Sequence, residues 1–350
     1  MKVLQLGPYP PPHGGVQSNL VAIRTFLRRQ GVPCAVINIT RHRKPDSDEV
    51  YYPRSSVGLI QLLLRLDYDV IHLHIGGMLT VKLLGLALVC TLMPGCKSVM
   101  TFHSGGYPGS ALGKSKGRNS LAGFVLRRFD GLIGVNPEIF GFFQRLGVSP
   151  DRTRLILPHA FLFDEQPAPI LTQPLASFYI THDPLLISVG LLEPEYDLPL
   201  QIEALAHVRR KFPSAGLVLI GSGSLEQELR SRISACPYAE HVLLCGDVPH
   251  ATTMHAISRA HLMLRTTLYD GDAVSVREAI HLGTPVIASN NGMRPAGVHL
   301  IPKSDLHALL HAIEDRLAQP VSRKAAAASD DSNVQAVFDL YRELSDENQP

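Results

Sequence analysis

Short runs of aliphatic and β-branched residues alternate with segments of helical periodicity along the whole chain. In the first half, the runs that predict buried strands are KVLQLG (2–7), CAVINI (34–39), VIHLHI (70–75), SVMTFH (98–103), GLIGV (131–135) and TRLILP (153–158). In the second half they are LLISVG (185–190), GLVLIG (216–221), HVLLCG (241–246), LMLRT (262–266) and PVIAS (285–289). Segments with apolar residues three and four positions apart lie between these runs and predict helices. Strands that alternate with helices are typical of parallel sheets with crossover connections.

A proline-rich stretch interrupts this alternation near the middle of the chain. We expect an N-terminal Rossmann-like domain at residues 1–165, a linker at 166–184 and a second Rossmann-like domain at 185–320. The last segment, 321–350, is expected to be a tail and an amphipathic helix that crosses back to the first domain. The predicted fold class is therefore α/β, with two Rossmann-like, doubly wound parallel-sheet domains facing across a cleft. A chain of 350 residues is long enough to give each domain its own core.

The charge of the chain is distributed unevenly between its two halves. Residues 1–160 hold 19 Lys and Arg against 8 Asp and Glu, a net of +11, whereas residues 161–350 hold 14 against 23, a net of −9. A basic half is typical of proteins that meet an anionic lipid surface, a phosphorylated substrate or nucleic acid, although an ordinary solvated surface can have the same composition. Because no basic strand is rich in aromatic residues for stacking bases, we expect no nucleic-acid partner.

Cysteine usage and the apolar segments predict a cytoplasmic location. The five cysteines are scattered and form no CxxC pair, which favours reduced thiols. The first residues, MKVLQLG, predict a strand and lack the basic and then apolar pattern of a secretory signal. The segment that most resembles a membrane span, residues 83–93, is shorter than the roughly 20 apolar residues that a span requires. We therefore expect a core helix there.

Residues with special chemistry or backbone freedom follow several of the predicted strands. In open α/β sheets, ligands bind beyond the carboxyl ends of the strands. The residues found at these ends are Gly14 and Gly15, His103, Gly190, Gly221 and Asp270. Their shared position indicates a ligand site more strongly than any one of them does alone.

The loop PPPHGGVQSNL places Gly14 and Gly15 directly before an expected helix at 16–30. Free N–H groups and the dipole at a helix start favour a phosphate group. The loop is neither a GxGxxG nor a Walker motif, so a ligand loop and a plain tight turn both remain open.

His103 lies at the end of a strand and is followed by two glycines that permit close approach of a substrate. It could donate a hydrogen bond to a developing charge or hold a substrate hydroxyl, and the alternative is a structural histidine bonded to a carbonyl. His72 and His74 alternate along the strand VIHLHI. A zinc site would need a third ligand at matching spacing, and the sequence shows none, so we expect no metal there.

Three carboxylates lie close together in TLYDGDAVSVREAIHLGTPVIAS, residues 267–289. Asp270 and Asp272 precede an expected helix, and Gly271 between them allows a tight turn. Glu278 lies within the helix and is followed by a segment that predicts a buried corner. One of the two aspartates is expected to cap the helix, which is a common role for aspartate, but capping does not explain Glu278.

The start of this helix favours an anion. The backbone N–H groups of Ala273, Val274 and Ser275 lie in the first turn, where they have no partners within the helix. Glu278 follows Val274 by one turn on the same face. A strand-end carboxylate, an anion-binding helix start and a second carboxylate match a ligand that carries hydroxyls, phosphates and hydroxyls in succession. A nucleotide sugar has this chemistry.

The motifs together resemble the retaining glycosyltransferases of family four, also called group one, which have the GT-B fold. The resemblance covers nearly the whole chain and is more specific in the C-terminal half. The segments that carry it, in the family's order, are GGV, FH, VNPEIFGFFQRLGV, LILPHA, LISVGLLEP, LVLIGSGSLEQEL, LLCGDVPH and REAIHLGTPVIAS.

The resemblance implies a role for each of two carboxylates that lie eight positions apart. Glu278 takes the position expected to bind the ribose hydroxyls. Asp270 takes the position of a family glutamate that lies near the donor sugar, and it is one methylene shorter. The arginine and lysine that often hold the diphosphate are replaced by Leu191 and Tyr196.

Arg265 and Arg294 are the candidates to supply the missing positive charge, although both could be structural. Together, the motifs and the resemblance predict a catalytic pair and a set of donor-binding residues. The catalytic pair is His103 and Asp270, and the donor-binding residues are Gly14, Gly15, Gly190, Gly221, Val248, Arg265, Gly271, Ala273, Val274, Ser275, Glu278 and Arg294.

We therefore expect a retaining, hexosyl-type glycosyltransferase that needs no metal or other cofactor and takes a nucleotide sugar as donor. The first domain is expected to bind a glycan or lipid-pyrophosphate acceptor, at the inner face of the cell membrane, in bacterial surface polysaccharide assembly. The alternatives are a sugar-nucleotide epimerase or phosphorylase on the same fold, and a non-catalytic nucleotide-sugar-binding homologue, which the absent Arg/Lys pair favours. A metal-binding DxD at Asp270–Asp272 is a further alternative, which the late position of the motif disfavours.

Overall fold

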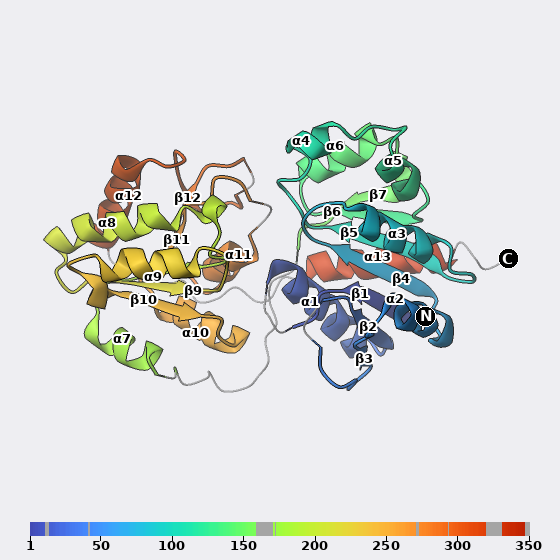
Figure 1. The fold of residues 1–350 in the computed structure, drawn as a ribbon, viewed down its shortest axis with the longest axis horizontal. Helices are drawn as coiled ribbons and strands as arrows, with labels where there is room; N and C mark the ends of the chain where they lie inside the picture. Colours follow the sequence, from blue (N-terminus) through green and yellow to red (C-terminus); the bar gives the residue numbers. More distant parts are fainter. Residues whose placement is uncertain are drawn as a thin grey trace. The chain divides into compact units, whose positions relative to one another are not determined.

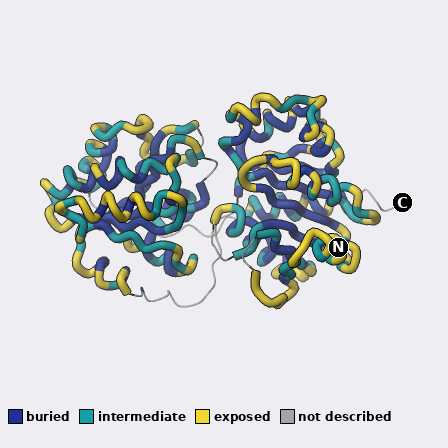
Figure 2. Tube along the Cα trace, viewed as in Figure 1, coloured by how far each residue is buried: buried dark blue, intermediate teal, exposed yellow. Residues whose placement is uncertain are grey.

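The computed structural model describes residues 1–10, 14–40, 43–158, 171, 173–270, 273–292, 294–319 and 331–346. The chain divides into two compact units (Figure 1). Unit 1 comprises Met1–Phe161 with Asp330–Pro350, and unit 2 comprises Leu162–Ser329. In each unit the strands are the most buried part (Figure 2), as expected for parallel sheets covered by helices.

Unit 1 contains a parallel seven-stranded sheet with the strand order β3-β2-β1-β4-β5-β6-β7. Its strands are β1 (Val3–Gly7), β2 (Cys34–Asn38), β3 (Val50–Tyr51), β4 (Val70–Ile75), β5 (Lys97–Phe102), β6 (Gly131–Gly134) and β7 (Thr153–Leu155). Its helices are α1 (Gly15–Arg29), α2 (Ser56–Arg65), α3 (Val81–Thr91), α4 (Ala111–Lys114), α5 (Leu121–Leu126), α6 (Pro137–Arg145) and α13 (Ser332–Asp346). The segment at residues 83–93 falls in α3, which contributes to the core.

The two faces of this sheet differ in chemistry because side chains alternate along a strand. Leu4 and Leu73 point into an apolar core that also contains residues of α2, α3, α5 and α6. Gln5, His72 and His74 have the opposite phase and are almost fully buried. A buried polar layer therefore lies within the first unit.

The helix α13 joins the first unit although it is last in the chain. Phe338 of α13 meets Phe26 of α1 edge to face, with ring centroids 6.1 Å apart. Tyr341 is fully buried, and its hydroxyl bonds Nδ1 of His72. Burial of one helix face against the sheet and α1 accounts for its position.

Unit 2 contains a parallel six-stranded sheet with the order β10-β9-β8-β11-β12-β13. Its strands are β8 (Leu185–Val189), β9 (Gly216–Ile220), β10 (Val242–Gly246), β11 (Leu262–Arg265), β12 (Val286–Ser289) and β13 (His299–Ile301). Its helices are α7 (Leu175–Thr181), α8 (Leu198–Lys211), α9 (Glu226–Ser234), α10 (His250–Arg259), α11 (Val274–His281) and α12 (Leu306–Ala318). The two sheets confirm the predicted pair of Rossmann-like parallel-sheet domains, whereas the short strands β3 and β13 were not predicted.

The predicted linker at 166–184 is wrong over its described part. Residues 175–181 form α7, in which Leu175, Phe178 and Tyr179 are buried in the core of the second unit. These apolar residues are three and four positions apart, which is helical spacing, but the prolines on both sides obscured the pattern. The remainder of the predicted linker, up to residue 170, lies outside the described residues.

Candidate functional site

Two glycines allow the carboxyl ends of β8 and β9 to approach closely. The N–H group of Gly190 donates to the carbonyl of Ile220 at 3.0 Å. Gly221 has a φ of +135°, and a Cβ there would lie 1.8 Å from the carbonyl oxygen of Gly190. A Cβ at Gly190 would lie 2.6 Å from Nη1 of Arg265. The glycine at position 221 therefore lets the two strand ends approach, and the glycine at position 190 leaves room for the side chains of Tyr196 and Arg265.

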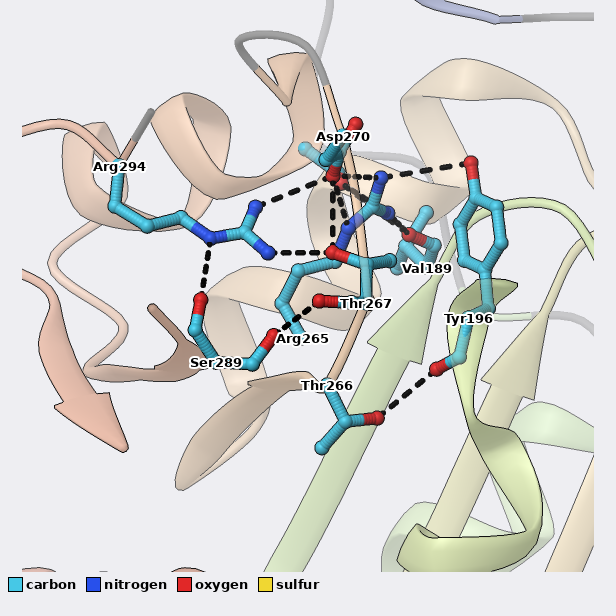
Figure 3. Close-up of polar contacts among 9 residues, drawn as sticks. Val189, Tyr196, Arg265, Thr266, Thr267, Asp270, Ser289 and Arg294 are labelled. Carbon is cyan, nitrogen blue, oxygen red and sulfur yellow. Dashed lines mark hydrogen bonds and ion pairs between the residues drawn. The ribbon is translucent and has the colours of Figure 1, made fainter. Parts of the chain in front are cut away.

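Arg265 and Arg294 both bind the carboxylate of Asp270 (Figure 3). Nε and Nη2 of Arg265 lie 2.9 and 2.7 Å from Oδ2 of Asp270, and Nη1 of Arg294 lies 3.1 Å from the same oxygen. The arginine side chains are 6% and 2% exposed, and the Asp270 side chain is 15% exposed. Three residues predicted from the sequence thus form one charged cluster.

Backbone carbonyls at two further strand ends hold the arginines in place. Arg265 donates from Nη1 to the carbonyl of Val189 at 2.7 Å, and Arg294 donates from Nε to that of Ser289 at 3.1 Å. The ring of Tyr196 lies against Arg265, with the guanidinium carbon 4.5 Å from its centroid. This is a cation–π contact. The tyrosine at the family's lysine position therefore orients the arginine that lies beside it.

Two buried guanidinium groups, those of Arg265 and Arg294, share one carboxylate oxygen of Asp270 in this cluster. A charged group removed from water is stable only when it is paired or hydrogen-bonded. Carbonyl dipoles and the Tyr196 ring satisfy part of this requirement for Arg265, but they do not neutralise its charge. An anion that reaches the cluster would interact with it strongly, because little water screens these groups.

The helix α11 begins beside this cluster. Ala273 is its N-cap residue, and an alanine side chain cannot cap the helix. The hydroxyl of Ser275 donates to the carbonyl of Val189 at 3.2 Å, which holds the helix start against the end of β8. Of the two aspartates expected as candidates for the helix cap, Asp270 does not take that role, because its carboxylate binds the two arginines. Gly271 and Asp272 lie outside the described residues.

Glu278 lies one turn further along α11 and is paired with a histidine. Its side chain is 4% exposed, and Oε1 lies 2.6 Å from Nε2 of His250, the first residue of α10. Burial acts to lower the pKa of His250, but the hydrogen bond and the charge of Glu278 outweigh burial and raise it above the ordinary value. The pair is therefore an ionic contact in weakly acidic solution.

His103 directly follows β5 in the first unit. Its Nε2 lies 3.4 Å from Nδ1 of His74 on the neighbouring strand β4, and the two rings are stacked. His74 is 1% exposed, whereas His103 is partly exposed. Burial lowers the pKa of both imidazoles below the ordinary value. Both rings are therefore neutral near pH 7.

The remaining predicted donor residues lie at element ends. Gly14 is the N-cap of α1, Gly15 is its first residue, and both are exposed. Val248 follows β10 and is partly buried against the core that contains Ala273. Val274 is buried in the first turn of α11.

Several contacts at the site were not predicted from the sequence. They involve His250, Tyr196 as a partner of Arg265, Thr267 and Ser289, which contact Arg294, and Gln5, which contacts His74. The position of Gln5 in the first strand could have been noticed, because a glutamine in an otherwise apolar buried strand requires a polar partner. The other contacts join separate strand ends and leave no periodic signal.

The described residues contain neither a metal-binding group of side chains nor a membrane-spanning helix. Within the ranges that the structure describes, no group of three or more His, Cys, Asp and Glu side chains is arranged to hold a metal ion. In the same part of the chain, no helix is both long enough and apolar enough to span a bilayer.

Comparison with known protein families identifies both halves of the chain. A family model described as "Glycosyl transferases group 1" matches residues 177–327, and one described as "Glycosyltransferase Family 4" matches residues 13–158. A GDP-mannose-dependent alpha-(1-6)-phosphatidylinositol monomannoside mannosyltransferase from Mycolicibacterium smegmatis is 28% identical over 157 residues, which are 41% of each protein. The chain thus matches about two fifths of that relative's length.

Solved structures resemble the chain over nearly its full length. The catalytic domain of starch synthase IV from Arabidopsis thaliana, bound to ADP and acarbose, has a TM-score of 0.71 with 12% identity and 99% coverage of both chains. HepE from Anabaena, in complex with UDP and glucose, has a TM-score of 0.66 with 17% identity and the same coverage. Such low identity establishes the fold alone.

The fold is that of the GT-B glycosyltransferases, with two Rossmann-like parallel-sheet units. The chain belongs to the group 1 glycosyltransferases of family four.

Proposed function

We propose that this transferase moves a sugar from a nucleotide sugar to a glycan or lipid-linked acceptor, with retention of the anomeric configuration. The two buried arginines that share the carboxylate of Asp270 at the strand ends, Arg265 and Arg294, carry the proposal. A diphosphate would bring negative charge beside them, and guanidinium groups match phosphate oxygens in geometry. The cluster would then replace the family's arginine and lysine, whose positions hold Leu191 and Tyr196.

Glu278 supports the same ligand. His250 holds Oε1 of Glu278, so the direction of the carboxylate is set before a ligand arrives. We assign the second oxygen, Oε2, to the ribose hydroxyls. Such a bond between hydroxyl and carboxylate is charge-assisted and stronger than a neutral one. Asp270 would act mainly by orienting the arginines, with the sugar near its Oδ1.

The first domain would bind the acceptor at the inner face of the cell membrane, in surface polysaccharide assembly. Leu112, Leu121 and Phe124 are about half exposed on α4 and α5. Lys114, Arg118 and Arg128 are also exposed in this segment. Exposed apolar side chains among cationic ones are typical of surfaces that meet anionic lipid. We therefore propose residues 111–128 as the membrane-facing segment.

A ligand screen with the purified protein tests the donor class. The mannosyltransferase relative is named for GDP-mannose, and the HepE structure holds UDP, so the panel contains GDP, UDP and ADP with their common sugars. A ligand at a hundred times its Kd stabilises the folded protein by about 2.7 kcal/mol, which is a measurable rise in Tm. The proposal predicts that one base is preferred and that its sugar nucleotide is turned over when an acceptor is present. Binding without any turnover on lipid-linked acceptors would favour the non-catalytic homologue.

A further inference from the structure

A chain of buried hydrogen bonds leads from the first strand to His103. Gln5 of β1 is fully buried, and its Oε1 lies 3.0 Å from Nε2 of His74. Nδ1 of His74 lies 3.4 Å from Nε2 of His103. At its other end, the Gln5 amide nitrogen lies 3.2 Å from Sγ of Cys34. The three residues come from neighbouring strands: Gln5 is the middle residue of β1, His74 is the last residue but one of β4, and His103 directly follows β5.

The direction of these hydrogen bonds determines which nitrogen of each imidazole carries the hydrogen. The oxygen of Gln5 can only accept, so Nε2 of His74 must carry the hydrogen. A neutral imidazole carries one hydrogen, so Nδ1 of His74 is an acceptor. Nε2 of His103 must then donate to it, and Nδ1 of His103 is left with a lone pair. Burial, which keeps His74 neutral, supports this assignment.

The packing around His74 leaves its ring little freedom to change partners. A Cβ at Gly7 would lie 3.0 Å from Cβ of His74, so glycine makes room for this side chain. The ring of His72 lies 4.0 Å from that of His74, centroid to centroid. His72 is itself held by Thr101, at 2.7 Å, and by the Tyr341 hydroxyl of α13. The ring of His74 is therefore held by the His72 ring beside it and by its bonds to Gln5 and His103.

We propose that Gln5 and His74 are positioning residues that hold His103 as its Nε2–H tautomer. Nδ1 of His103 then accepts a hydrogen bond from a sugar hydroxyl and does not donate one to a developing negative charge. Within the described residues, Nδ1 of His103 makes no hydrogen bond. The tautomer is a property of the free protein, whereas the bond to a sugar rests on the proposed function.

Nitrogen-15 NMR of the free protein, with labelled histidine, tests the tautomer. The His103→Gln variant identifies the His103 signals by their loss, and the long-range coupling pattern distinguishes a protonated nitrogen from a bare one. We expect hydrogen on Nε2 and none on Nδ1. A hydrogen on Nδ1 would mean that the Gln5 amide is reversed, and it would overturn the proposal whatever the protein's activity.

Variants at Gln5 separate positioning from simple structural support. Gln5→Glu keeps an acceptor facing His74, so the tautomer should be retained. Gln5→Leu removes the acceptor, so His103 should become a mixture of tautomers and kcat should fall about 2- to 10-fold, as for the loss of one neutral hydrogen bond. Binding of the nucleoside diphosphate should not change. Thr101→Val, which removes a hydrogen bond of His72 and leaves those of Gln5 and His74 in place, is the control. If His103 keeps a single Nε2–H tautomer in Gln5→Leu, the proposal is wrong. Gln5→Met replaces Gln5→Leu in this test if the leucine variant does not fold.

Ligand titration identifies which ligand supplies the hydroxyl that bonds Nδ1 of His103. A shift of the His103 Nδ1 resonance on adding the nucleotide sugar, but not the nucleoside diphosphate, would assign the bond to the donor sugar. A shift that requires the acceptor as well would assign it to an acceptor hydroxyl. No shift with either ligand would overturn the proposed bond while leaving the tautomer assignment intact.

Discussion

Arg265 donates hydrogen bonds from Nε and Nη2 to the same carboxylate oxygen, Oδ2 of Asp270, at 2.9 and 2.7 Å. The two residues are five positions apart, at the end of β11 and in the loop that follows. Arg294 approaches the same oxygen from a later loop. One carboxylate oxygen thus accepts hydrogen bonds from two buried guanidinium groups.

Asp270→Asn should destabilise the protein and increase its response to an anion. Removing one partner of a buried pair leaves a charge without compensation, which costs on the order of 3 kcal/mol when the group is largely buried. Denaturant unfolding should show this loss, and Glu226→Gln, an exposed pair on α9, should not. A nucleoside diphosphate should raise the Tm of Asp270→Asn more than that of the wild type, because it replaces the lost negative charge. An equal or smaller rise would contradict the role given to Asp270.

His250 should make stability depend on pH in the near-neutral range. Its pKa is raised in the folded protein by Glu278, against the effect of burial. A raised folded pKa contributes stability that is complete below the unfolded value of about 6.5 and is lost as the pH rises through the folded value. The difference in unfolding free energy between the wild type and His250→Gln should therefore be larger at about pH 5.5 than at about pH 8.5. A difference that does not change with pH would show that the pair is not ionic.

Removal of metal ions should leave activity intact. No trio of potential ligands is arranged for a metal within the described ranges, and the arginine cluster provides the positive charge that a metal would supply. Turnover with the donor should persist in excess EDTA. Complete loss on chelation, restored by manganese or magnesium, would revive the metal-binding interpretation of Asp270–Asp272.

The segment at residues 111–128 should bind anionic vesicles in a salt-dependent manner. Co-sedimentation at low ionic strength should decrease as salt screens the charges of Lys114 and Arg128. Phe124→Ser should reduce binding further, because it removes exposed apolar surface. Ile180→Ser on α7 is the matched control, since Ile180 is 82% exposed in the second unit. If Phe124→Ser and Ile180→Ser sediment equally, another surface meets the membrane.

The sequence predicted the fold well because the strands are buried on both faces and read as continuous apolar runs. It missed α7 because prolines flank a helix of only seven residues. Arg265, Arg294, Asp270 and Glu278 were predicted as site residues. Their partners were not, because contacts such as His250 with Glu278 join residues 28 positions apart that only the tertiary fold brings together. Asp270 is not the aspartate that caps the helix, since buried arginines compete for a carboxylate more strongly than backbone N–H groups do.

Calorimetric titration of the preferred nucleoside diphosphate into Arg265→Gln and Arg294→Gln tests the central claim most directly. Arg230→Gln, which removes an exposed charge on α9, is the control, and thermal melts verify that each variant is folded. A charge-assisted hydrogen bond contributes about 1.5–3 kcal/mol, so each buried arginine should account for roughly a 10- to 150-fold change in Kd. The account predicts this loss in Arg265→Gln and Arg294→Gln and wild-type affinity in Arg230→Gln. Equal affinity in all three variants and the wild type would show that the cluster is structural and that the diphosphate binds elsewhere.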